Sequence, residues 1–215
     1  MKPVISLPLL LVLISAIFAC SDRKEANEDN YGHAVQKYLD RKFPLKCLTY
    51  HFPVSARESS REHDILMNLK RFGIVKIKEI REQDGRATSW STEIIRVNQY
   101  FFDLTYRGSS HYYVDEECYD NDKRNFLGFG KANLTRIDKA VPYEANGRKL
   151  VNVHCTFEVS DVPEWARDKY VLDAIRLVHP KICRDMEKYG RGGLIKELLT
   201  LELGEKEWEV LEKKS

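Results

Sequence analysis

The stretch from Val151 to Val159 (VNVHCTFEV) decides the fold. Its odd-numbered positions are all apolar and its even-numbered positions are all polar. Because successive side chains of a strand point to opposite faces, this alternation predicts a strand with one buried face. His154 and Glu158 fall on the exposed face, where they could form an acid–base pair with a third group or remain solvated side chains.

Turn signals on both sides extend this strand into a sheet. Asn146-Gly147 is a strong hairpin signal, so residues 131–137 should pair with the strand from its N-terminal side. Residues 194–203 and 208–211 should form a second hairpin at the C-terminal end.

Helical segments separate the two hairpins. Asp161 can cap a helix that has Pro163 and Glu164 in its first turn. Pro180 should end this helix and begin a second, short one. The fold class expected for residues 131–215 is α+β: a four-stranded antiparallel sheet with helices packed on one face, in the order ββαββ.

The first half of the mature chain predicts two helices and two strands. Apolar residues at helical spacing predict a helix from Tyr31 to Leu39, capped by Asn30 and stopped before Pro44. A capping box at residues 59–62 begins a second helix, which should end at Gly73. A strand follows from Ile74, then a turn at Asp84-Gly85, then a strand over residues 100–105.

This order of elements resembles the winged-helix family. The similarity rests on Leu66-x-x-Leu69-x-x-x-Gly73-Ile74-Val75, a polar wing, and Phe102-Asp103-Leu104-Thr105-x-x-Gly108. It implies a winged-helix-like α+β region over residues 31–108, and a generic small α+β core is the alternative. In DNA-binding members the second helix lies in the major groove. Here its outer face mixes Arg61, Lys70 and Arg71 with Glu62 and Asp64, so we expect no nucleic-acid partner.

The first 19 residues have the pattern of an export signal. Lys2 precedes an almost wholly apolar run from Leu7 to Ala19. The end of this run, Ile17-Phe18-Ala19-Cys20, resembles the lipobox of bacterial lipoproteins. That resemblance implies cleavage before Cys20, acylation of Cys20 and attachment to a lipid bilayer through it. Ordinary cleavage after Ala19, which would give a secreted protein, and an uncleaved anchor are the alternatives.

The residues after Cys20 suggest where the protein resides. Ser21 follows the cysteine, which resembles the pattern of lipoproteins sorted to the outer membrane, so we expect a lipid-anchored envelope protein that faces the periplasm. Residues 20–30 are polar, without apolar periodicity, and predict a flexible tether. Residues 109–130 hold aromatic and acidic side chains without periodicity and predict a linker. Its acidic residues lack the spacing of a helix–loop–helix calcium site, which favours a solvated loop.

The cysteines of the mature chain give two predicted disulfides. Cys155 lies on the buried face of its strand, and Cys183 lies on the inward side of the short helix that should pack over it. We therefore expect Cys155–Cys183, which leaves Cys47–Cys118 as the other pair. The rival interpretation is that Cys155 is a buried thiol.

No stretch of the sequence carries a recognisable catalytic, metal-binding or cofactor-binding motif. The net charge of +2 is nearly balanced and indicates neither a nucleic-acid binder nor an acidic surface. We therefore expect no catalytic residues, no metal and no cofactor. The leading hypothesis is a non-enzymatic envelope lipoprotein that acts as a binding or inhibitor/immunity-type module with a protein partner. A periplasmic enzyme with a noncontiguous site and a membrane-tethered DNA-binding regulator are the alternatives.

Overall fold

The computed structural model describes residues 23–86, 94–115 and 124–212. Its largest sheet has four antiparallel strands in the order β10-β9-β8-β7. The strands are β7 (Lys131–Ala145), β8 (Arg148–Ser160), β9 (Gly193–Leu203) and β10 (Trp208–Val210). Asn146 and Gly147 join β7 to β8 with positive φ angles, as a tight hairpin requires. The predicted α+β class, with a four-stranded antiparallel sheet, is confirmed.

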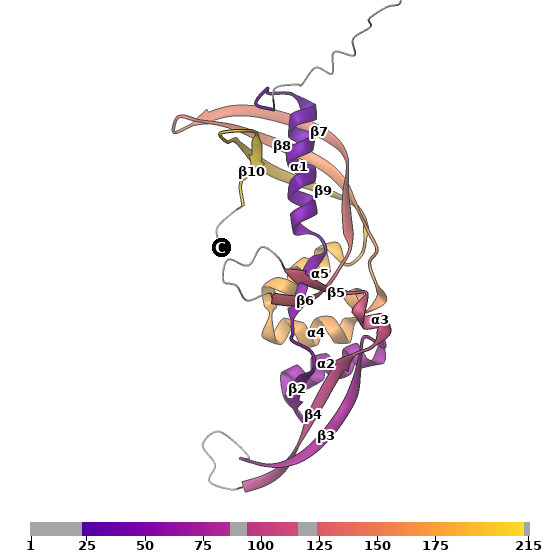
Figure 1. The fold of residues 1–215 in the computed structure, drawn as a ribbon. Helices are drawn as coiled ribbons and strands as arrows, with labels where there is room; N and C mark the ends of the chain where they lie inside the picture. Colours follow the sequence, from indigo (N-terminus) through magenta and orange to yellow (C-terminus); the bar gives the residue numbers. More distant parts are fainter. Residues whose placement is uncertain (1–22, 87–93, 116–123, 213–215) are drawn as a thin grey trace, which may run out of the picture.

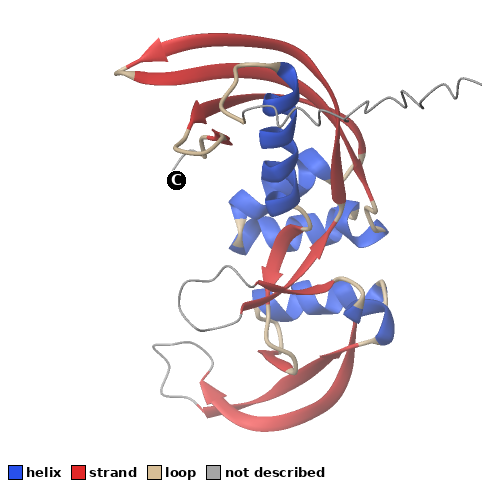
Figure 2. Cartoon of the chain, turned by 45° about the horizontal axis from the view of Figure 1, so that its top comes forward, coloured by secondary structure: helices blue, strands red, loops and turns tan. Residues whose placement is uncertain are grey.

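Helix α1 (Glu28–Lys42) covers the inner face of this sheet. The sheet curves around the helix, as Figure 1 and Figure 2 show. The apolar stripe of α1 and the odd-numbered residues of Val151 to Val159 are buried in the same hydrophobic core. Helix α1, which begins the region predicted to be winged-helix-like over residues 31–108, thus packs on the C-terminal sheet.

The middle of the molecule combines helices with a small sheet. The helices are η1 (Glu164–Arg167), α4 (Lys169–Val178) and α5 (Pro180–Tyr189), and α5 begins at Pro180 as predicted. The sheet has the order β1-β6-β5, from β1 (Leu45–Thr49), β5 (Tyr112–Asp115) and β6 (Arg124–Phe129). The prediction of an irregular linker over residues 109–130 is therefore wrong for its described parts. Strand β5 pairs with β6, and β6 pairs in turn with β1, far away in the sequence, so local periodicity does not reveal this sheet.

The other end of the molecule is a three-stranded sheet in the order β2-β4-β3. It is formed by β2 (Val54–Arg57), β3 (Val75–Arg86) and β4 (Ile94–Leu104), and the short α3 (Tyr106–Ser109) follows it. The turn predicted at Asp84-Gly85 is wrong, because both residues continue β3 and pair with Arg96 and Ile95. Helix α2 (Arg61–Arg71) packs on this sheet and on α4.

Three helix caps differ from those predicted. Asn27, rather than Asn30, caps α1, and its side chain accepts a hydrogen bond from the backbone N–H of Asn30. Ser60 caps α2. Asp168 caps α4, where its side chain accepts from two backbone N–H groups. Asp161 lies before η1 at a φ of 56°.

The start of the described chain is folded against the body. The guanidinium group of Arg23 lies 3.3 Å from the Glu207 carboxylate. The backbone oxygen of Glu25 accepts hydrogen bonds from the side chains of Asn30 at 2.9 Å and Trp208 at 3.2 Å. These contacts hold residues that were predicted to belong to a flexible tether over 20–30. None of the helices in the described ranges has both the length and the apolar character needed to cross a bilayer.

Candidate functional site

The outer face of the large sheet is the surface that faces away from α1. It carries the alternate side chains of β7, β8 and β9, which the strand pleat directs away from the core. Within the described ranges the helices near this sheet lie on its concave side, so none covers the outer face (Figure 1, Figure 2). The sheet is therefore open to a partner on this side.

Large apolar side chains are exposed on the outer face. Leu194 is 66% exposed and Leu198 is 56% exposed, and Val141 on β7 is also exposed. Most surfaces expose single apolar residues, but Leu194 and Leu198 lie on one strand, four residues apart and on the same face. They form an exposed strip along β9, with Lys196 between them on the same face.

A groove of about 540 Å³ crosses the outer face next to this strip. The lining residues are Asp138, Lys139, His154, Cys155, Lys196, Glu197 and Leu198. Strand β7 bulges here, because the register with β8 shifts between Ile137 and Lys139 and leaves Asp138 as an extra residue. A bulge re-aims a side chain locally, and here it brings the Asp138 carboxylate onto the outer face.

The Asp138 carboxylate is fixed by two neighbours. Its oxygens accept hydrogen bonds from the Arg136 guanidinium group and from the Thr156 hydroxyl, each at 2.5 Å. The bond from Arg136 is the main cause that lowers the pKa of Asp138, and the bond from Thr156 adds to it. Asp138 therefore stays ionised near neutral pH, and its charge is balanced by Arg136.

Besides Asp138 and Glu197, whose carboxylates accept hydrogen bonds from neighbouring side chains, the groove lining carries two lysines. Lys139 on β7 lies opposite His154, and Lys196 on β9 lies opposite Thr156, so the two lysines come from the two strands that flank β8. Within the described part of the chain neither ammonium group forms a salt bridge. The groove therefore presents two ammonium groups without salt bridges beside exposed Leu198, and these features would suit a ligand with an apolar group and carboxylates.

The groove does not assemble a nucleophile with a base. Glu158 is not part of its lining, so His154 and Glu158 do not converge. The Cys155 thiol belongs to the buried face and donates to the backbone oxygen of Glu197 at 3.6 Å. Burial and the nearby Glu197 carboxylate raise the pKa of Cys155 to about 11, which keeps the thiol protonated. A cysteine nucleophile reacts as the thiolate, and this geometry keeps the Cys155 thiol protonated.

Beneath the groove, on the inner side of the sheet, lies a polar cluster that sequence reasoning missed. The inner polar cluster consists of Tyr38, Lys42, Lys188, Tyr189 and Glu197. The ammonium group of Lys42 donates to both tyrosine hydroxyls, and the Glu197 carboxylate accepts from Lys188 at 2.8 Å and from Tyr189 at 3.2 Å.

The electrostatics of the inner polar cluster keep Lys42 charged. Burial alone would lower the pKa of Lys42, but the hydrogen bonds to Tyr189 and Tyr38 raise it above its ordinary value. Burial raises the pKa of Tyr38, so its hydroxyl stays protonated. The hydrogen bonds of the cluster connect α1, α5 and β9, so its role is structural. No local signal could have revealed it, because its members come from distant segments of the sequence.

The cysteines do not form the predicted pair in this structure. Cys155 and Cys183 are both buried free thiols, and Cys183 donates to the backbone oxygen of Leu172 at 3.5 Å, on α4. The two thiols thus face different backbone carbonyls, one in the sheet and one in the helical layer. Cys47 is also a buried free thiol, whereas Cys118 lies outside the described residues.

The lipid-attachment residue, Cys20, also lies outside the described residues. Among the residues that are described, no group of three or more His, Cys, Asp or Glu side chains could hold a metal ion. Comparison of the chain with models of known protein families, with curated proteins and with solved structures found no match.

Proposed function

We propose that this chain is a non-enzymatic envelope lipoprotein that binds a protein partner through the outer face of its large sheet. The observation that carries the proposal is the exposed strip of Leu194 and Leu198 beside two cations without salt bridges, on a face that no described helix covers. An apolar anchor with a charged rim is the usual anatomy of a protein-binding patch. The lipid anchor at Cys20 would hold this face in the periplasm.

The chemistry of the surface specifies the partner. Lys139 and Lys196 would meet carboxylates on the partner, and Leu198 would fill an apolar depression between them. An inhibitor or immunity-type role fits this mode, because an enzyme's active-site cleft can offer an apolar depression with acidic walls.

Site-specific photo-cross-linking in cells tests the proposed surface. A photoreactive residue at Leu198 should give a discrete adduct, and the same residue at Ile80 should not. Ile80 is a matched control, because it is 52% exposed but lies in the sheet at the opposite end. Charge reversal by Lys139→Glu or Lys196→Glu should weaken the adduct, by about threefold to tenfold each. Two outcomes would show that the outer face is not the binding surface. One is an equal yield of adduct from Ile80 and Leu198, and the other is a yield from Leu198 that neither charge reversal changes.

Metabolic labelling with a tagged fatty acid tests the anchor separately. The wild-type protein should incorporate the label, and Cys20→Ser should abolish incorporation and leave unprocessed precursor or release soluble protein. Wild-type protein without label would exclude the lipoprotein part of the proposal.

A further inference from the structure

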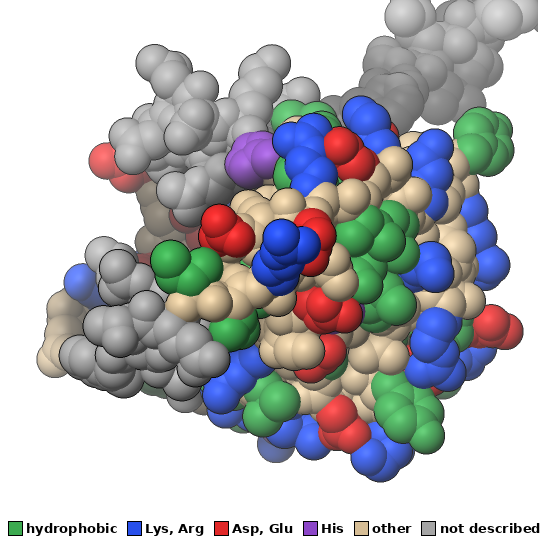
Figure 3. All heavy atoms as spheres, turned by 90° about the horizontal axis from the view of Figure 1, so that it is seen from below, with side chains coloured by type: hydrophobic (Ala, Val, Ile, Leu, Met, Phe, Trp, Pro, Cys, Tyr) green, Lys and Arg blue, Asp and Glu red, His purple; other side chains and the backbone are tan. Residues whose placement is uncertain are grey.

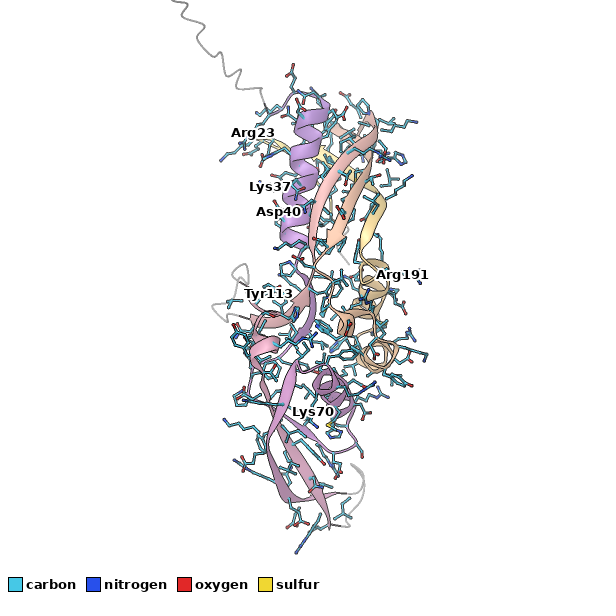
Figure 4. All side chains as sticks on the ribbon, turned by 90° about the vertical axis from the view of Figure 1, so that its right-hand side faces the viewer. Arg23, Lys37, Asp40, Lys70, Tyr113 and Arg191 are labelled. Carbon is cyan, nitrogen blue, oxygen red and sulfur yellow. The ribbon has the colours of Figure 1, made fainter. Side chains whose placement is uncertain are left out.

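The folded body of the protein begins very close to the proposed lipid-carrying residue. Arg23 pairs with Glu207, and the backbone oxygen of Glu25 accepts hydrogen bonds from Asn30 and Trp208. Figure 4 shows Arg23 at the end of the molecule where α1 begins. Lys37 lies on α1 itself, farther from that end. Three residues after Cys20 the chain is therefore already attached to the sheet.

This short connection fixes which end of the protein meets the membrane. Three residues span at most about 11 Å even when fully extended. A lipid on Cys20 would hold the end with Arg23 and the β7–β8 hairpin against the head groups. The β3–β4 hairpin lies at the opposite end and would point away from the bilayer (Figure 1).

The end that would meet the membrane contains a pocket of about 420 Å³. It forms on the inner face of the sheet, because α1 begins only at Glu28 and leaves the β7–β8 hairpin uncovered. Pro142, Leu203 and Trp208 give it an apolar wall. The volume falls within the range of about 300–1,000 Å³ that is typical of small-molecule pockets.

Charged and amphipathic residues complete the lining of the pocket. Lys24 and Lys149 contribute ammonium groups, and Glu144 contributes one carboxylate. Tyr143 belongs to the lining as well, and its side chain is partly exposed. Tyrosine and tryptophan favour the boundary between head groups and acyl chains, because their rings are apolar and one end is polar.

We propose that this pocket binds a phospholipid with an anionic head group from the same bilayer. The phosphate would lie near Lys24 and Lys149, and the first part of one acyl chain would lie against Pro142, Leu203 and Trp208. The inference rests on the lipid anchor of the proposed function and adds a second membrane contact to it. Two membrane contacts fix the orientation of the protein, and a second contact also strengthens anchoring.

Quenching of tryptophan fluorescence by brominated lipid tests the pocket. The full lipidated protein is reconstituted into vesicles of phosphatidylethanolamine and phosphatidylglycerol with brominated acyl chains. All variants carry Trp90→Phe, so that Trp165 and Trp208 are the remaining tryptophans. Trp208→Phe should abolish most of the quenching, whereas Trp165→Phe should retain it. Trp165 is the matched control, because it is 1% exposed against 3% for Trp208 and packs beside Phe129 in the middle of the molecule.

A charge variant tests the head-group contact independently of the tryptophan. Lys149→Glu should lower the quenching at least about threefold, and Lys78→Glu on exposed β3 should leave it unchanged. Vesicles of phosphatidylethanolamine alone should quench less than vesicles that contain phosphatidylglycerol. Quenching that is equal in both vesicles, or unchanged by Trp208→Phe, would overturn the inference.

The outcome separates the pocket from the anchor. Protein that carries the fatty-acid label but shows no quenching of Trp208 would reject the pocket and keep the anchor. Unlabelled protein whose Trp208 is still quenched by added vesicles would reject the anchor and keep the pocket. A cross-link from Tyr143 to another protein in place of lipid would show that the pocket binds a protein segment and would reject the phospholipid.

Discussion

The ammonium group of Lys42 lies 2.8 Å from the hydroxyl of Tyr189, and this contact joins the last turn of α1 to the last residue of α5. The same ammonium group lies 4.7 Å from the centre of the Tyr189 ring, so it binds both the hydroxyl and the π face. Tyr189 in turn donates to Glu197 on β9. One lysine thus couples the helix inside the large sheet to the helical middle of the molecule.

Removal of this lysine should destabilise the fold. Lys42→Met keeps the length of the side chain but removes its hydrogen bonds to two tyrosine hydroxyls, and we expect a loss of about 1–3 kcal/mol in the free energy of unfolding. Lys188→Met is the matched control within the same inner polar cluster. Lys188 is exposed, so solvent screens its ion pair with Glu197, and the loss should stay below about 1 kcal/mol. Urea unfolding measures both. Equal losses would show that Lys42 contributes no more than a surface charge.

The buried thiol of Cys155 should make stability fall at alkaline pH. Its pKa is raised from 9.0 to about 11, so the unfolded chain loses this proton at lower pH than the folded chain. The stability from the protonated thiol is complete below the unfolded pKa and is lost as the pH rises through the folded pKa. From about pH 8 to about pH 10 the wild-type protein should lose about 1 kcal/mol more than Cys155→Ala. Unfolding in the presence of a reductant measures the difference, and parallel pH curves would contradict it.

The three described cysteines should be free in the folded protein. Cys47, Cys155 and Cys183 are buried thiols, so they should resist alkylation in the native state and react once the chain is denatured, without prior reduction. Mass spectrometry of the peptides identifies each site. A cross-linked peptide that contains Cys155 and Cys183 would restore the pairing that their apolar positions suggested.

The sequence predicted the large sheet because its signals are local. Strict alternation over Val151 to Val159 and the Asn146-Gly147 turn are sufficient to predict two strands and the hairpin that joins them. The same logic failed at Asp84-Gly85, where pairing with β4 overrides the turn preference of the two residues. It also missed β5 and β6, which form a sheet through the pairing of β6 with β1, far away in the chain.

The sequence predicted only part of the candidate surface. Alternation placed His154 on an exposed face, and the structure confirms that it is exposed. The β7 bulge that brings Asp138 to the groove has no local signature, because it arises where the register of two strands slips. The exposure of Leu194 and Leu198 also could not be predicted, since an apolar strand residue is usually assigned to the core.

The protein should not bind duplex DNA with sequence preference. Helix α2, which the winged-helix resemblance would make the recognition helix, packs against α4. There Arg61 donates to the backbone oxygen of Leu177, while Arg71 lies over the ring of Tyr170. These arginines are thus engaged within the fold. Figure 3 shows the end of the molecule that carries the β3–β4 hairpin, where acidic and basic side chains are intermixed over the surface. A gel shift at physiological salt measures binding, and a sequence-selective complex would contradict this expectation.

Glu207 should control how firmly the start of the chain is attached to the sheet. Its carboxylate accepts a hydrogen bond from Lys37 and lies near Arg23 and His33, and the bond from Lys37 is the main cause that lowers its pKa below 4.5. A carboxylate with a lowered pKa stabilises the folded form above its ordinary pKa, and this contribution is lost as the pH falls through the lowered value.

Neutralisation of Glu207 should therefore loosen residues 23–30 at neutral pH. Glu207→Gln should speed hydrogen exchange of their backbone amides about threefold to tenfold, while exchange in β8 stays unchanged. Glu205→Gln is the control, because Glu205 is exposed in the same turn and forms no ion pair with any described residue. Wild-type protection should persist as the pH falls through 4.5 and disappear only below it. Fast exchange of residues 23–30 in the wild-type protein at neutral pH would mean that this segment is a loose tether, and the argument for a membrane-facing pocket would lose its geometric basis.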